Sequence, residues 1–371
     1  METLRHTAIL LFLSFALADT SAAFDLSPKG TKYDQAAVKA WSSWLDGILS
    51  RLADKGLKKF KEPVHEEITH RIFGCNYEGS AICGKVDAPD FASPYVIAGV
   101  RWNDDPPFQM NDDQARGLGC KLSYPDGRRM TIRFITQPEC WARLFLHAED
   151  QIKSDASIKF DQTTQAALPL RSHLGDLQFL HSMASSDGEG AIETREKILG
   201  WAQFTWGVVQ GDFPLETWLK DIPQTTVQKY LGSSGWRVQD LFALGDPSLR
   251  ASISDVAFGS LLHMIEDSFA AGHVERLEPA DGSVCPGSTY PMPGPIVEYH
   301  SYTNQSSSKH AKADTREAFA NNRLAPDVVD VGRVLVSLKK AKAKWPDVES
   351  YLKCVYNLSP TVHGASAGPF N

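Results

Sequence analysis

One segment of the chain carries side chains suited to metal-dependent chemistry. His263 and Asp267 are four residues apart in the run LLHMIEDSFAAGH, so they share a face if this run is helical. A neutral imidazole and a carboxylate are ordinary zinc ligands. Gly272 is expected to end the helix and to let His273 turn back toward the same site. An ordinary His–Asp pair on a helix is the alternative, but the third ligand and the apolar flank favour a metal site.

Each of the other candidate metal ligands is weaker evidence for a metal site when it is considered alone. His310 and Asp314 repeat the four-residue spacing, which is also common on solvated helices. Asp104 and Asp105 precede a proline, and two acids in that position can form a plain turn. His300 has no partner at helical spacing, so we interpret it as a structural or supporting residue.

The histidines nearer the N-terminus also lack a decisive local motif. In the run VHEEITHR, His65 and His70 are too far apart for the HExxH pattern of metalloproteases, because the second histidine comes one position late. His173 is followed by Asp176 three residues later, and His181 comes soon after.

Taken in chain order, these residues resemble the ligands of the zinc-dependent phospholipase C and single-strand nuclease superfamily. That family has an early His, a W-x-D, an H-x-x-D, an H-x3-D-x5-H and a final H-x3-[D/E]. The resemblance covers roughly residues 60–320 as separate islands, and the run around His263 is its most specific part. The ligand set that it implies is His65, Asp104, His173, His263, Asp267, His273, His310 and Asp314. His181 is a rival to His173, and Asp105 is a rival to Asp104.

The resemblance implies a mainly α, multi-helix fold like that of phospholipase C and P1 nuclease, holding about three zinc ions per chain. Asp267 would bridge two zinc ions, one also bound by His65 and the other by Asp104 and His173. The third zinc ion would bind His273, His310 and Asp314. The family's best-known members also bind zinc through a mature N-terminal Trp, whereas the mature chain here is expected to begin at Phe24.

The activity implied by the resemblance is hydrolysis of a phosphoester by metal-activated water, with Asp104 as the catalytic residue that orients or deprotonates the water. The preferred interpretation is a phospholipase C that cleaves glycerophospholipids to diacylglycerol and a phosphorylated head group at a membrane or micelle surface. A nuclease or 3′-nucleotidase on the same zinc site, with nucleic acid as its partner, is the first alternative. A non-catalytic secreted metal-binding protein is the second.

Helices must position most of these residues. Apolar residues at three- and four-residue steps predict helices over residues 36–57, 193–209, 254–270 and 328–343. A small β-hairpin is expected over residues 121–135, a loop over 276–298 and a loose tail over 359–371. We predict one helical domain over residues 24–358, with an insertion at about 106–171 that contains the hairpin. Trp201, Phe204 and Trp206 have helical spacing and are expected to lie in the core.

The N-terminus and the cysteines point to export. Arg5 precedes an apolar run over residues 7–18 and a small-residue cleavage site ending at Ala23, which is typical of a signal peptide. No stretch is long and apolar enough for a transmembrane segment. The expected location is therefore secreted or periplasmic. The net charge of −7 argues against bulk attraction to nucleic acid or anionic lipid.

Six cysteines behind a signal peptide indicate disulfides, although six allow 15 pairings. Short loops favour Cys75–Cys83 and Cys120–Cys140, which leaves Cys285–Cys354. Zinc binding by cysteine is the weaker alternative, because no pair has the two-residue spacing of a zinc knuckle.

Overall fold

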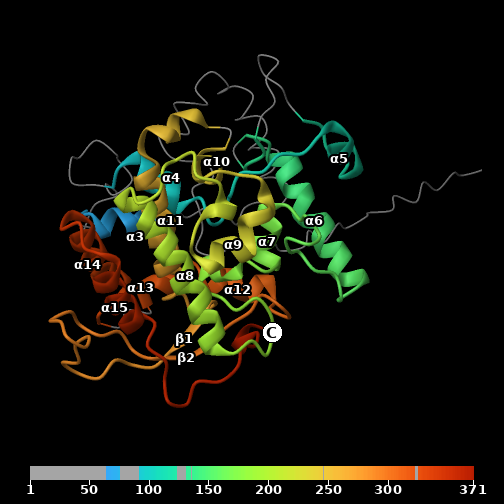
Figure 1. Cartoon of the computed structure of the whole chain (residues 1–371). Helices are drawn as coiled ribbons and strands as arrows, with labels where there is room; N and C mark the ends of the chain where they lie inside the picture. The colour runs from blue at the N-terminus through green and yellow to red at the C-terminus, as the bar shows by residue number, and fades with distance from the viewer. Residues whose placement is uncertain (1–63, 76–91, 123–130, 135, 245, 322–324) are drawn as a thin grey trace, which may run out of the picture.

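The computed structural model describes residues 64–75, 92–122, 131–134, 136–244, 246–321 and 325–371. These residues are mainly helical, as predicted (Figure 1). The predicted helix over 36–57, the signal peptide over 1–23 and the expected mature end at Phe24 all lie outside the described residues.

Two helices form the centre of the main core. Helix α11 (Ile253–Asp267) is buried around nearly its whole circumference, and it packs against α8 (Ala191–Gln210). Trp201 and Phe204 of α8 are fully buried, which confirms the prediction that these aromatic residues belong to the core. Both helices were predicted, but α11 ends at Asp267 rather than near Gly272. The chain between Asp267 and Gly272 therefore runs as turns that bring His273 back to the core.

A close backbone crossing fixes α4 (Pro94–Val100) on α11. A Cβ atom added at Gly99 would lie 2.0 Å from the carbonyl oxygen of Val256, and one added at Gly259 would lie 2.1 Å from that of Val96. Only glycine leaves room for two backbones this close. The crossing matters for the site, because Asp104 follows α4 and two other candidate ligands lie on α11.

Several of the remaining helices also contact α11. Helix α14 (Val328–Lys340) was predicted, and it is capped by the preceding residue, Asp327, whose side chain accepts hydrogen bonds from the backbone nitrogens of Val329 and Asp330. Helix α3 (Val64–Ile72) packs against α14 and α4. The other elements are α7 (Leu168–Leu174), η4 (Gln178–His181), η5 (Leu219–Asp221), α9 (Thr225–Leu231), η6 (Gly232–Ser234), α10 (Val238–Ala243), η7 (Pro247–Ser252), α12 (Ser307–Ala313), α13 (Arg316–Asn321) and α15 (Trp345–Val355).

A second, smaller hydrophobic core lies within the predicted insertion. Its buried members all fall between Phe108 and Leu170, and they pack around α5 (Asp112–Gly117) and α6 (Pro138–Ser154). In Figure 1 these two helices lie on the opposite side of the molecule from α14 and α15.

The predicted hairpin is not seen among the described residues of 121–135. Ile132 instead forms an isolated antiparallel bridge with Phe108, and residues 123–130 lie outside the described part.

The only sheet among the described residues is two-stranded and antiparallel. It pairs β1 (Val274–Arg276) with β2 (Ile296–Tyr299), at the two ends of the segment predicted as a loop.

The prediction of a loose tail over residues 359–371 is wrong. Ser366 forms a parallel bridge with His300, and its hydroxyl donates to Glu298. The tail ends in η8 (Gly368–Phe370), and the carbonyl oxygen of Phe370 accepts from the backbone of Ser306.

Two disulfides match the predicted pairing. Cys120–Cys140 lies within the predicted insertion and ties the segment after α5 to the start of α6, and Cys285–Cys354 ties the loop between β1 and β2 to α15. Cys83 lies outside the described residues, so the Cys75–Cys83 pair stays a prediction. Disulfides of this kind form in oxidising compartments, in accord with export. No helix in the described part of the chain is both long and apolar enough to cross a membrane.

Candidate metal centre

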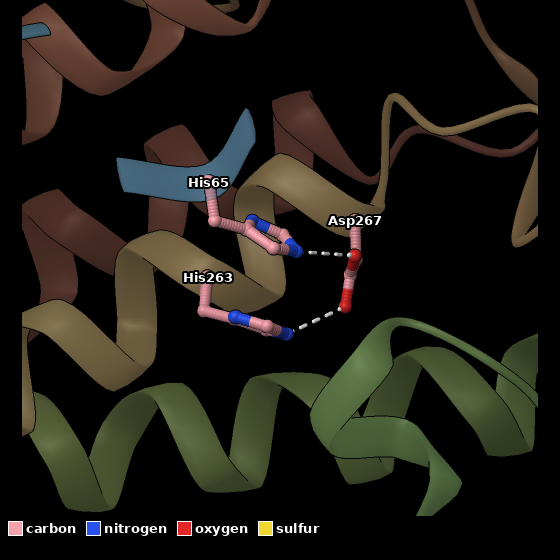
Figure 2. A group of neighbouring side chains, drawn as sticks. All are labelled: His65, His263 and Asp267. Atoms are coloured by element: carbon pink, nitrogen blue, oxygen red, sulfur yellow. Dashed lines mark ion pairs between the residues drawn. The ribbon is translucent and has the colours of Figure 1, made fainter. Parts of the chain in front are cut away.

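Three groups of buried histidine and aspartate side chains meet at the centre of the main core. The first contains His65 of α3 and both His263 and Asp267 of α11 (Figure 2). Nε2 of His65 lies 3.4 Å from Oδ1 of Asp267, and Nε2 of His263 lies 2.9 Å from Oδ2. The two rings stack with their centroids 4.0 Å apart. The helical four-residue spacing and the packing of α3 against α11 therefore direct two imidazoles at one carboxylate.

The second group surrounds Asp104, which lies in the turn after α4. Oδ1 of Asp104 is 3.7 Å from Nδ1 of His181 and 3.8 Å from Nε2 of His263. Nε2 of His173 is also 3.7 Å from the same oxygen. His173 and His181 were considered as rivals, yet both lie beside Asp104. Only His181 belongs to the tightest group, with its Nδ1 atom 3.1 Å from Nε2 of His263.

The third group contains His273, His310 and Asp314. His310 is in α12 and Asp314 directly follows that helix, while His273 directly precedes β1. Nε2 of His310 is 3.0 Å from one oxygen of Asp314, and Nε2 of His273 is 3.9 Å from the other. The predicted ligand set thus converges on one place, although its members span about 250 residues of the chain.

Four of the histidines are held in the orientation typical of metal ligands. Each has its Nδ1 atom on an oxygen outside the cluster, so that Nε2 points inward. His263 Nδ1 lies 2.7 Å from the carbonyl oxygen of Val100, and His65 Nδ1 lies 2.6 Å from Oε2 of Glu266. For His173 the oxygen is the carbonyl of Pro169, and for His273 it is the carbonyl of His181. If Nδ1 carries the proton, the inward Nε2 atom has a free lone pair, as a metal ligand requires.

The spacing of the imidazole nitrogens around Asp104 fits a shared metal ion better than it fits hydrogen bonds. Two atoms bound to one tetrahedral zinc ion at about 2.0–2.1 Å lie roughly 3.3 Å apart. The four imidazole nitrogens around Asp104 lie 3.7–4.0 Å from its oxygens, beyond hydrogen-bonding distance. Neither oxygen of Asp104 accepts a hydrogen bond from any described residue, although the side chain is almost fully buried. Such a carboxylate is costly unless it binds a cation.

The protonation equilibria of the metal-free site follow from burial and from the carboxylates. Burial lowers the pKa of His181 to about 4, and it also lowers the pKa values of His273 and His310. Burial alone would lower the pKa of His65, but the contacts with Asp267 and Glu266 outweigh it and raise that pKa well above its usual value. Burial would raise the pKa of Asp267, yet the surrounding histidines hold it well below its usual range. Burial thus favours the neutral form of His181, His273 and His310, and the histidines favour the ionised form of Asp267; these are the forms that bind zinc.

Two acids near the predicted ligands have other partners. Asp105, the rival to Asp104, accepts a hydrogen bond from the backbone nitrogen of Phe134 at 2.9 Å and faces Arg133. Asp176 forms a two-pronged ion pair with Arg171, with both distances at 2.8 Å. These carboxylates therefore organise the surrounding structure. His300 is buried with its Nδ1 atom 3.2 Å from the carbonyl oxygen of Gly272, in accord with a supporting role.

Sequence reasoning missed two residues of the site. Glu266 is fully buried and accepts from both His65 and the hydroxyl of Thr69 at 2.6 Å. Its position next to Asp267, in the mainly apolar second half of a helix, was the available signal. Tyr302 packs against three of the candidate ligands, and nothing in its local sequence indicated this.

Comparisons of this chain with family models, with curated proteins and with solved structures found no match. The candidate metal centre therefore stands on its own geometry. The resemblance to zinc-dependent phospholipases C and single-strand nucleases remains a prediction from the sequence.

Proposed function

We propose that the protein is an exported zinc-dependent phosphodiester hydrolase, and that its substrate is a glycerophospholipid cleaved in the manner of a phospholipase C. The observation that carries the proposal is the environment of Asp104. A buried carboxylate has four imidazole nitrogens 3.7–4.0 Å away and accepts no hydrogen bond from the described residues. A multi-metal site would satisfy every one of these groups.

The sharing of ligand residues favours a connected set of metal ions over isolated structural ones. His263 belongs to two of the three groups. The two oxygens of Asp267 face different histidines, since Oδ1 lies near His65 and Oδ2 lies near His181 and His263. Closed structural zinc sites use mostly cysteine and histidine, whereas this centre has three carboxylates. This composition supports hydrolysis over a purely structural role.

Different residues of the chain would bind the metal ions, orient the water and position the ligands during hydrolysis. When bound, zinc ions lower the pKa of water to about 7 and neutralise charge that builds up on phosphoryl oxygens. Asp267 would be a metal ligand through both of its oxygens, each of which faces different histidines. Asp104 would orient the attacking water and accept its proton. Glu266 and the backbone carbonyls would keep the imidazole ligands in their binding tautomers.

The choice of phospholipid over nucleic acid depends on the sequence resemblance. The net charge of −7 provides no bulk attraction for a polyanion such as DNA. A purified, zinc-loaded protein should hydrolyse phosphatidylcholine in mixed micelles and release diacylglycerol. Faster cleavage of single-stranded DNA or of a 3′-nucleotide would replace the phospholipase with the nuclease.

A second experiment separates an enzyme from a non-catalytic metal-binding protein. Asp104→Asn removes one charge at the centre of the site, and we expect turnover to fall about a hundredfold or more while the fold persists. Asp113→Asn, on the exposed face of α5, is the matched control and should retain activity. Unchanged turnover in the Asp104 variant would exclude the proposed mechanism.

A further inference from the structure

Tyr302 has a buried hydroxyl group without a partner in the described part of the chain. Its side chain is only 7% exposed, and the hydroxyl makes no hydrogen bond to any described residue. An unsatisfied buried hydroxyl costs roughly 1–3 kcal/mol. A ligand of the candidate metal centre would provide the missing partner, because the ring of Tyr302 packs against three of the candidate metal ligands.

The ring of Tyr302 connects two of the three ligand groups. Its centroid lies 4.7 Å from that of His310 and 6.0 Å from that of His273, both of the third group. It also lies 6.4 Å from the ring of His173, which stands beside Asp104. The ring of Tyr302 therefore lies between the third ligand group and the histidine beside Asp104.

A backbone hydrogen bond and ring packing fix the position of Tyr302. Its backbone nitrogen donates to Oε1 of Gln178 at 3.0 Å, and that glutamine is itself buried. Packing against three imidazoles leaves the ring little rotamer freedom. A preorganised donor of this kind loses little entropy when it binds an acceptor.

The Tyr302 hydroxyl carries one O–H donor, which an acceptor would satisfy. The carboxylates of Asp104, Asp267 and Asp314 are close enough to act electrostatically on the phenol, yet none forms a hydrogen bond with it. In a site that binds cations, the acceptor that lies between metal ions is an anionic oxygen of the ligand. We propose that the Tyr302 hydroxyl donates a hydrogen bond to a phosphoryl oxygen of the substrate.

This inference deepens the proposed function and rests on it, but it can be tested without turnover. Zinc-loaded protein should bind inorganic phosphate, measured by isothermal titration calorimetry. Tyr302→Phe removes only the hydroxyl, and we expect phosphate binding to weaken at least about tenfold while the zinc content stays unchanged. Tyr299→Phe is the matched control, because Tyr299 is even more deeply buried and its hydroxyl also lacks a described partner, yet it lies beside Arg276 and Tyr356 rather than the metal groups. That variant should bind phosphate like the wild type.

Hydrolysis of bis(4-nitrophenyl) phosphate gives a second readout. Loss of the hydrogen bond should lower kcat more than it raises KM if the bond strengthens as charge develops on the phosphoryl oxygens. If the wild type binds phosphate but hydrolyses no phosphodiester, the proposed function fails while the tyrosine can still be shown to bind phosphate. Equal phosphate affinity in Tyr302→Phe and the wild type overturns the inference, as does a zinc-loaded wild type that binds no phosphate.

A third measurement covers the case in which Tyr302→Phe does not fold or loses zinc. 3-Fluorotyrosine in place of Tyr302 keeps the hydroxyl and nearly the same shape. Its 19F resonance should shift when phosphate is added to the zinc-loaded protein, whereas 3-fluorotyrosine in place of Tyr299 should show no shift. No shift at position 302 would overturn the inference.

Discussion

Glu266 and His65 lie on different helices, and their side chains meet at 2.6 Å between Oε2 and Nδ1. Both residues are fully buried. The contact orients the ring of His65 so that Nε2 points at Asp267, the next residue along α11 from Glu266. One turn of helix thus supplies both a candidate ligand and the residue that orients another.

Replacing Glu266 should therefore weaken metal binding without removing a ligand. Glu266→Gln keeps the shape but removes the charge that supports the Nδ1–H tautomer of His65, and we expect zinc affinity at this position to fall about 10–100-fold. Competition with a chromophoric chelator measures the affinity. Glu193→Gln, at a mostly exposed acid of α8, serves as the control. Equal zinc affinity in the Glu266 variant and the wild type would show that the pair does not orient a ligand.

The metal-free protein should lose stability as the pH falls from about 6.5 to about 4. Burial lowers the pKa values of His70 and His181 to about 4 and also lowers that of His273. In this window the unfolded chain binds protons that the folded chain excludes, so stability decreases toward acid. His181 alone would contribute on the order of 2 kcal/mol between pH 7 and pH 5. The raised pKa of His65 acts in the opposite direction and offsets part of this loss.

Urea unfolding in the presence of EDTA at pH 7 and pH 5 measures this dependence. Zinc-loaded protein should show a steeper loss, because the ligands must also be deprotonated to bind. A free energy of unfolding that is equal at the two pH values, or higher at pH 5, would show that these histidines are not buried in their neutral form.

The crossing of α4 and α11 should tolerate no side chain at Gly99. A Cβ atom there would lie 2.0 Å from the carbonyl oxygen of Val256, so Gly99→Ala must push the two helices apart. We expect a destabilisation of about 1–3 kcal/mol or more, together with reduced zinc content, because α4 leads directly to Asp104. Gly117→Ala is the control, since a Cβ atom there would meet nothing within 4 Å. Differential scanning calorimetry and metal analysis would show whether only the Gly99 variant is affected.

Periodicity and spacing predicted the elements whose structure is decided locally. The apolar pattern of α8, α11 and α14 corresponds to their burial in the core. The four-residue spacing of His263 and Asp267 placed both on one face of α11, and their side chains do meet. These features depend on neighbours within one or two helical turns, which a single sequence displays.

Features set by contacts between distant segments could not be predicted. His181 lies in the short η4 turn, and only the fold brings it within 3.1 Å of His263. The tail was predicted to be loose because the residues that hold it are distant in sequence. Its bridge joins Ser366 to His300, 66 positions earlier in the chain. Gly272 was interpreted as a helix end, but its role is spatial, because a Cβ atom there would lie 2.9 Å from Nδ1 of His310.

The measurement that tests the central claim most directly is elemental analysis of the purified mature protein by inductively coupled plasma mass spectrometry. The three groups of buried ligands predict about three zinc ions per chain. His310→Ala should lower that number, whereas His147→Ala, at an exposed histidine of α6, should not. Protein that folds without bound metal, and that takes up none when zinc is added, would contradict the account.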